Sequence, residues 1–330
     1  MNRRKFITNT SLAMVGIGAG IDAAMAGGRQ PLGSAKRVGI IGLDTSHSLA
    51  FAEGLNDPSS ALSTSGYRVT AAYPYGSTIA ISTSRIPGYI KDIQPYGVKI
   101  VESVSALLAE VDYVLLETND GNPRLAQATE VIEAGKPVFI DKPIAASLAD
   151  VRKIYALAEA RRVPIFSASS LRYMDTIQDA INGKIGKILG ADTYSPATFE
   201  PHHSDFFWYG IHGVESLVAL MGVGCKEVTR THTEGTDVVV GTWSDGRIGT
   251  FRGNRTGKHT YGGTAYGENG DLTLGPYKGY DSLLSEIIRF FDTGQSPVAA
   301  KETLEIYRFM AAADVSKSRG GAVVALSEVD

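Results

Sequence analysis

Residues 37–48 read RVGIIGLDTSHS, and this stretch decides the fold. The apolar run Val38–Ile41 is typical of a buried strand, and Gly42 follows it where a nucleotide-binding turn begins. A dinucleotide fingerprint would continue with a second and a third glycine, but Asp44 and His47 occupy those two positions. The stretch therefore predicts the first strand and turn of a Rossmann-type domain with altered ligand contacts.

Length, composition and charge limit the possible classes of protein. A chain of 330 residues with 43% hydrophobic content is long enough to bury a large core and to form two domains. A net charge of −3, without a clustered basic stretch, excludes a nucleic-acid-binding surface. Cys225 is the only cysteine, so no internal disulfide is possible, and we expect a buried thiol.

The first 26 residues have the composition of an export signal. Residues 2–7, NRRKFI, form a twin-arginine opening, and a stretch rich in glycine and alanine leads to the small-residue site Ala24–Ala26. We therefore expect an exported, periplasmic protein that uses the twin-arginine route, with a general secretory signal as the alternative. The apolar stretch is short and contains Asp22, so we expect no permanent membrane span.

Residues 37–168 alternate between strand-like and helix-like patterns. Strands are predicted at Val38–Ile41, Arg68–Ala72, Lys99–Val101, Tyr113–Leu116, Val138–Ile140 and Pro164–Ser167. Helices are predicted between them at Leu49–Leu55, Val104–Ala109, Arg124–Ala134 and Leu148–Ala160. This alternation predicts an α/β domain with a doubly wound parallel sheet.

The second half of the chain has a different pattern. Strands are predicted at Asp237–Trp243, Gly246–Arg252 and Asp271–Leu274, and helices at Val214–Met221, Leu283–Asp292 and Thr303–Ser316. This pattern predicts an α+β domain with an open, mainly antiparallel sheet. We therefore predict an export signal in residues 1–26, a nucleotide-binding-like Rossmann domain in 27–148, and a substrate and oligomerisation domain in 149–330.

A series of short motifs gives the chain a resemblance to a known family. Residues 134–143, AGKPVFIDKP, resemble the AGK…EKP segment of the Gfo/Idh/MocA family, with Asp141 in place of glutamate. Residues 170–173 (SLRY), 183–188 (GKIGKI) and 210–215 (GIHGVE) resemble three later family motifs in the same order. The resemblance implies an NAD(P)-dependent oxidoreductase that acts on a sugar, a sugar derivative or a cyclitol. It also implies a homo-oligomer formed through the C-terminal sheet.

The resemblance assigns catalytic roles to two residues. Lys142 matches the family lysine beside the nicotinamide, where an ammonium group orients the substrate hydroxyl and stabilises a developing oxyanion. His212 matches the general acid–base, because imidazole titrates near ambient pH. The alternative interpretation of Lys142 is a surface lysine at the end of a strand. The alternative interpretation of His212 is a hydrogen-bonded histidine in the core.

The cofactor site departs from the family pattern. A carboxylate at Asp44 is expected to repel the pyrophosphate that helix N-termini bind. The second strand ends in Ala72–Ser77 without an acid for the ribose, while Ser77 leaves room for the 2′-phosphate of NADP. The candidate cofactor-binding residues are Gly42, Asp44, Thr45, Ser46, His47, Ser77, Asn119 and Asp141. We expect either NAD or NADP as the cofactor, and we expect no bound metal ion.

Other residues are candidates for contact with the substrate. Trp208 replaces the family aspartate four residues before His212, and its ring offers either a platform for a sugar or a part of the interdomain core. The loop 200–205, EPHHSD, has ligand types suited to a metal, but a polar lining for a sugar cleft is the preferred interpretation. The candidate substrate residues are Arg172, Trp208, His202, Asp205 and Glu215.

Three classes of function agree with this sequence. The first is a periplasmic NAD(P)-dependent oxidoreductase that acts on a small carbohydrate and holds its cofactor tightly. The second is a carbohydrate lyase, hydrolase or isomerase on the same scaffold. The third is a sugar-binding protein without catalytic activity.

Overall fold

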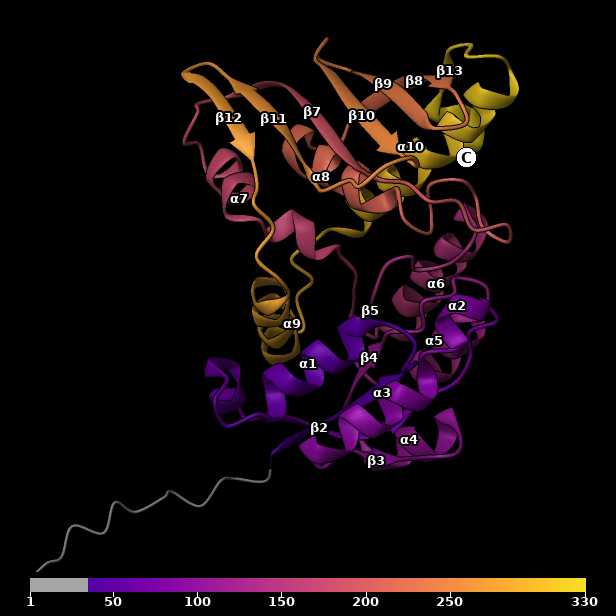
Figure 1. Cartoon of the computed structure of the whole chain (residues 1–330), viewed down its shortest axis with the longest axis vertical. Coiled ribbons are helices and arrows are strands. Elements are labelled where there is room, and N and C mark those ends of the chain that lie inside the picture. Colours follow the sequence, from indigo (N-terminus) through magenta and orange to yellow (C-terminus); the bar gives the residue numbers. More distant parts are fainter. Residues whose placement is uncertain (1–34) are drawn as a thin grey trace, which may run out of the picture. The chain divides into compact units, whose positions relative to one another are not determined.

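The computed structural model describes residues 35–330, whose strands form two sheets (Figure 1). The prediction of an export signal in residues 1–26 lies outside the described residues. Within the described part, no helix is long and apolar enough to cross a membrane. Cys225 is a free, buried thiol, and burial raises its pKa to about 12.

The first sheet is the parallel sheet that the sequence predicts. Its strands are β1 (Lys36–Ile41), β2 (Tyr67–Tyr73), β3 (Lys99–Ile100), β4 (Tyr113–Leu116), β5 (Val138–Ile140) and β6 (Ile165–Phe166). Their order is β3-β2-β1-β4-β5-β6, and every neighbouring pair is parallel. The order reverses between β1 and β4, and ligands of open α/β sheets bind at the carboxyl ends of the strands at such a point.

Helices cover both faces of this sheet, because its strands are apolar on both sides. They are α1 (Ser46–Asn56), α2 (Ala80–Thr83), α3 (Ile86–Ile93), α4 (Val104–Glu110), α5 (Arg124–Glu133) and α6 (Leu148–Arg161). Leu115 and Phe139 belong to the same core cluster as Phe51 of α1, whereas Leu116 and Ile140 belong to the opposite cluster. The alternation of neighbouring side chains between two cores confirms a sheet buried on both faces.

The second sheet is mixed and mostly antiparallel, as predicted. Its strands are β7 (Ile188–Pro196), β8 (Cys225–His232), β9 (Thr236–Trp243), β10 (Ile248–Asn254), β11 (Gly262–Gly267), β12 (Gly270–Leu274) and β13 (Val324–Ala325). The order is β12-β11-β7-β10-β9-β8-β13, and only β7 and β10 pair in parallel. Helices α7 (Asp175–Ile181), α8 (Ile211–Met221) and α10 (Ala300–Ser318) lie along one face of this sheet (Figure 1).

The boundary between the two domains lies later than the predicted position after residue 148. Helix α6 packs beside α5, and β6 pairs with β5, so both belong to the Rossmann domain. Helix α9 (Asp281–Thr293) returns to that domain from the C-terminal half. Its Phe290 ring lies 5.6 Å from the Phe166 ring, because the apolar face of α9 completes the core beside α1.

Candidate active site

The turn after β1 is held against the end of β4. Gly42 has a φ of 95°, and a Cβ atom there would lie 2.4 Å from the backbone nitrogen of Thr118. Glycine is therefore required for close packing between two strands at this position. The Ser48 hydroxyl donates to the Gly42 carbonyl at 2.8 Å, and Thr45 precedes helix α1 without a side-chain cap.

Asp44 has a different role from the one expected. Its carboxylate is buried, and the backbone N–H of Asn119 donates to its two oxygens at 3.0 and 3.1 Å. Burial raises the pKa of Asp44, while the hydrogen bonds and the Arg124 guanidinium oppose that shift. Asp44 does not line the cavity described below. The carboxylate therefore tethers the loop after β4 to the turn after β1 and does not face the ligand space.

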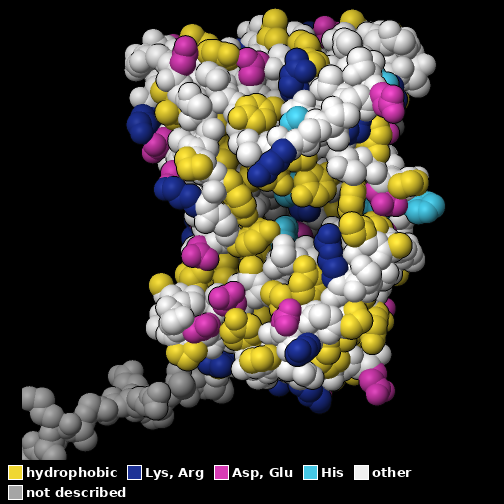
Figure 2. All heavy atoms as spheres, in the orientation of Figure 1, with side chains coloured by type: hydrophobic (Ala, Val, Ile, Leu, Met, Phe, Trp, Pro, Cys, Tyr) yellow, Lys and Arg dark blue, Asp and Glu magenta, His cyan; other side chains and the backbone are white. Residues whose placement is uncertain are grey.

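A cavity of about 160 Å³ lies at the carboxyl edge of the first sheet, where both domains contribute to its walls. Figure 2 shows a recess at mid-height on the corresponding face, with histidine and hydrophobic side chains at its rim. The lining residues from the Rossmann domain are Thr45, Ser46, His47, Arg85, Asn119 and Lys142. Those from the rest of the chain are Ser170, Leu171, Trp208, Tyr209, His212, Tyr261, Tyr277 and Tyr280.

His212 lies in the first turn of α8 and faces the cavity. Its Nδ1 atom is 2.7 Å from the hydroxyl of Ser169, which follows β6. Burial lowers the pKa of His212 well below its usual value, and the nearby positive charge of Lys142 adds to that effect. Burial therefore favours the neutral imidazole, and Nε2 can accept a proton in the tautomer in which Nδ1–H donates to Ser169.

Lys142 follows β5 and is buried at the cavity wall. Its Nζ atom lies 5.8 Å from the centre of the Tyr209 ring. Within residues 35–330, Lys142 forms no ion pair, so its charge is free to act on a ligand. Arg85 is the second cation of the lining and likewise has no ion pair within the described part of the chain.

Aromatic side chains form most of the remaining wall. The Tyr261 ring lies 5.6 Å from the His212 ring, and the Tyr280 ring lies 4.5 Å from the His47 ring. The indole Nε1–H of Trp208 is buried and has no hydrogen-bond partner among the described residues. An aromatic wall with a free donor is suited to a ligand that has both flat apolar faces and hydroxyl groups.

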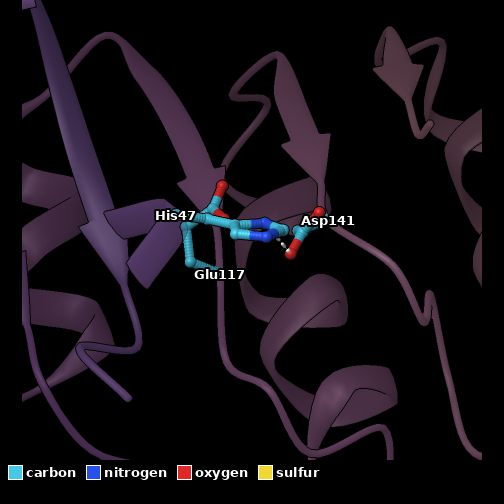
Figure 3. Close-up of side chains that lie close together, drawn as sticks. All are labelled: His47, Glu117 and Asp141. Atoms are coloured by element: carbon cyan, nitrogen blue, oxygen red, sulfur yellow. Dashed lines mark ion pairs between the residues drawn. The ribbon is translucent and has the colours of Figure 1, made fainter. Parts of the chain in front are cut away.

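Three further side chains converge beneath the cavity, at the point where the strand order reverses (Figure 3). They are His47 at the start of α1, Glu117 after β4 and Asp141 after β5, and their ligand atoms lie within 4.8 Å of one another. Burial raises the pKa of Glu117, and the neighbouring Asp141 charge raises it further. Burial also acts to raise the pKa of Asp141, but the charges of His47, Lys142 and Arg124 outweigh it and lower the value.

Glu117 was not predicted as a site residue. The available signal was its position, because it is an acid directly after the buried strand Tyr113–Leu116. Its pairing with His47 and Asp141 depends on the order of the strands, which brings three separate segments to one edge.

Several predicted residues lie outside the cavity. Arg172 and Glu215 form a buried ion pair at 2.9 Å, and Glu215 also accepts from the backbone N–H of Ser169 at 2.8 Å. Asp205 forms ion pairs with Arg230 at 2.6 Å and with Lys317 at 2.7 Å, and His202 is exposed. The polar loop 200–205 therefore neither converges with Glu215 on a metal nor lines the cavity. Arg172 and Glu215 brace the segment that holds His212.

The start of α1 offers a site for the phosphate groups of a nicotinamide cofactor. The uncapped start of α1 opens to the cavity through Thr45 and Ser46, and helix N-termini bind phosphate groups. The adenosine end departs from the family pattern, because no acid follows β2 and Ser77 does not line the cavity. Instead, Thr78 donates to Asp120 at 2.7 Å, and Asn119 donates to Ser82 at 2.8 Å. These bonds hold segment 78–82 across the loop after β4.

Comparisons with known proteins agree with this arrangement. The fold and the cleft define a two-domain protein whose first domain is of the Rossmann type. Residues 36–169 match the family described as "Oxidoreductase family, NAD-binding Rossmann fold" (Gfo/Idh/MocA), so the first domain is similar to the NAD-binding domain of that family. Similar curated proteins are the uncharacterized oxidoreductase YhhX of Escherichia coli, 28% identical over 29% of this chain, and the uncharacterized protein YMR315W of Saccharomyces cerevisiae, 27% identical over 44%. These matches span 31% and 50% of the two relatives.

Solved structures share the fold over nearly the whole chain. The scyllo-inositol dehydrogenase of Lactobacillus casei, solved with NAD(H) and scyllo-inositol, is 16% identical and has a TM-score of 0.72. It covers 89% of this chain and 99% of its own. An oxidoreductase of Agrobacterium radiobacter, solved with NAD⁺, L-tartaric acid and magnesium, is 15% identical with a TM-score of 0.71, covering 90% of this chain and 100% of its own.

Proposed function

We propose that this protein is an oxidoreductase that transfers a hydride between a nicotinamide cofactor, NAD or NADP, and an alcohol carbon of a small carbohydrate. One observation carries the proposal: Lys142 and His212, from different domains, line the same cavity. An unpaired ammonium group and a neutral imidazole are the two groups that oxidation of an alcohol requires from the protein. The match of residues 36–169 to an oxidoreductase family supports the same reaction.

The roles of the two side chains follow from their surroundings. A bound nicotinamide supplies the hydride acceptor. His212 accepts the hydroxyl proton at Nε2, because Ser169 holds Nδ1 and fixes the ring. Lys142 stabilises the oxygen as negative charge develops on it, and burial strengthens that interaction. Trp208 and the tyrosines of the lining exclude water and pack against the substrate.

The lining also restricts the class of substrate. The cavity is smaller than the sites that hold drug-sized ligands, so the substrate that reacts there with the nicotinamide is a small molecule. Its lining contains the cations Arg85 and Lys142 and no carboxylate. We therefore propose that the preferred substrate is a sugar or cyclitol derivative that carries an acidic group, which Arg85 binds.

A direct assay tests the proposed reaction. The purified protein is incubated with a panel of neutral sugars, cyclitols and sugar acids, together with NAD⁺ or NADP⁺, and reduction is followed by nicotinamide absorbance. Small molecules released from denatured protein are analysed by mass spectrometry, since a tightly held cofactor would escape a steady-state assay. Turnover of a panel member without reduction of either form of cofactor would favour the lyase, hydrolase or isomerase class.

We also propose export through the twin-arginine route and self-association through the second sheet. The sequence NRRKFI at residues 2–7 supports the first proposal. Replacement of Arg3 and Arg4 by lysine should retain the precursor in the cytoplasm, and normal processing of that variant would contradict the route. The second proposal is supported by apolar side chains on the open face of the sheet, and its test is given in the Discussion.

A further inference from the structure

The side chains of His47, Glu117 and Asp141 lack the hydrogen bonds that buried polar groups normally make. Among the described residues, buried atoms without a hydrogen-bond partner include both carboxylate oxygens of Glu117, Oδ1 of Asp141 and Nδ1 of His47. Glu117 is fully buried, with 0% of its surface exposed. An unpaired buried carboxylate is costly, so this concentration of unpaired atoms indicates a missing ligand.

The contact between His47 and Asp141 supports the same interpretation. Nδ1 of His47 lies 2.7 Å from Oδ2 of Asp141, as the dashed line in Figure 3 shows. The two atoms form an ion pair, while Oδ1 of Asp141 and both oxygens of Glu117 have no partner among the described residues. An imidazole nitrogen and carboxylate oxygens that lie within 4.8 Å of one another can serve together as ligands of one ion.

The nearby arginine and lysine side chains make no direct ion pair with the two carboxylates. Arg124 is buried beside them, but its guanidinium donates to the backbone carbonyls of Thr118 and Asp141 and not to a carboxylate of this cluster. Lys142 forms no ion pair with Glu117 or Asp141. The unpaired carboxylate oxygens of Glu117 and Asp141 are therefore available to a cation bound between them.

We propose that His47, Glu117 and Asp141 bind a divalent transition-metal ion, such as Mn²⁺ or Zn²⁺, at the floor of the cavity. One imidazole and two carboxylates suit these ions. The three residues come from the start of α1 and the ends of β4 and β5, so the rigid sheet holds them in place. His47 also lines the cavity, which places the remaining coordination positions next to the substrate space. The inference goes beyond hydride transfer and does not depend on it.

Metal content tests the proposal without reference to activity. The full-length protein is treated with a chelator, loaded with Mn²⁺ or Zn²⁺, desalted and analysed by mass spectrometry of its metals. We expect about one ion per chain in the wild type and less than about a tenth of that in Glu117→Gln, which keeps the shape of the side chain but removes an anionic ligand. Glu305→Gln is the matched control, because Glu305 is a partly buried acid far along the chain that binds only backbone N–H groups here, and it should load as the wild type does.

Thermal unfolding adds a second measurement. Mn²⁺ or Zn²⁺ should raise the melting temperature of the wild type and of the control, but not that of Glu117→Gln. If Glu117→Gln fails to fold, Co²⁺ added to the wild type still tests the site, because coordination by an imidazole and carboxylates produces visible absorption bands. Two results would overturn the proposal: much less than one ion per chain in the wild type with either metal, or the same metal content in Glu117→Gln as in the wild type. The three side chains would then be a group that shares protons.

Discussion

The backbone N–H of Asn119 donates to both carboxylate oxygens of Asp44, at 3.0 and 3.1 Å, and thereby joins the turn after β1 to the loop after β4. The residue that breaks the dinucleotide fingerprint is thus part of the framework of the site. It connects the two strands between which the strand order reverses.

This tether predicts a loss of stability in Asp44→Gly. Removal of the carboxylate leaves the Asn119 N–H without its partner, and such a loss costs about 1–3 kcal/mol of the free energy of unfolding. Asp44→Asn retains an acceptor and should lose less. Urea unfolding of both variants measures the difference. If the glycine variant is as stable as the wild type, the hydrogen bonds contribute nothing to the fold.

Burial of His212 in its neutral form predicts a dependence of stability on pH. The pKa of His212 is lowered in the folded protein, so the unfolded chain binds more protons below the unfolded pKa of about 6.5. The stability that His212 contributes is therefore complete above that pH and decreases as the pH falls, by up to about 1.4 kcal/mol per pH unit. His212→Gln does not titrate and should lose less stability than the wild type between about pH 7.5 and 5.5. If the stability of the wild type and of His212→Gln changes with pH in the same way, the His212 ring is protonated or solvated in the folded protein.

The unpaired Arg85 predicts discrimination between acidic and neutral substrates. Arg85→Gln should raise the KM for a sugar acid by at least about tenfold, which corresponds to the loss of a charged hydrogen bond. The KM for the nicotinamide cofactor and for a neutral analogue should change little. Lys91→Gln, an exposed change in α3 outside the cavity, is the matched control. A uniform rise in every KM would instead indicate that Arg85 only supports the loop.

The open face of the second sheet predicts self-association. Ile248 and Tyr266 pair with Gly190 from opposite sides of β7, and they are 54% and 38% exposed. Tyr194, further along β7, is 39% exposed. Groups of exposed apolar side chains are typical of protein–protein interfaces, so we expect one here. Ile248→Asp should shift the molecular mass in solution toward the monomer, as measured by light scattering, and a wild type that is monomeric at all accessible concentrations would refute the interface.

The Rossmann half was predictable because its strands are continuous apolar runs. Tyr113–Leu116 and Val138–Ile140 have the predicted bounds, since burial on both faces leaves no room for polar residues within them. Strand β7 was missed because its inward-facing positions are the small residues Ala191, Thr193 and Ser195, which give no hydrophobic alternation. The return of α9 to the first domain also has no local signal, because it depends on packing between distant segments.

The site was predictable only in part, because it also depends on contacts between distant segments. Lys142 and His212 stand in motifs that the sequence displays, and both line the cavity. Arg172, Glu215 and Asp205 stand in similar motifs, but their charges are paired with other side chains. Charge pairing depends on which distant residues fold nearby, so a motif identifies a residue without revealing its partners. Glu117 was missed because its neighbours come from two other segments.

Turnover of Lys142→Met and His212→Asn tests the central claim most directly. Positioned acid–base groups contribute about 10² to 10⁴ in rate, so His212→Asn should lower kcat by that factor while the protein stays folded. Lys142→Met keeps the aliphatic stem and removes the charge, and it should lose at least as much. The measurement is the rate of nicotinamide reduction with the best substrate from the panel, at matched concentrations of folded protein. Losses of this size in both variants are the predicted result, and near-normal reduction rates in both would contradict the proposed mechanism.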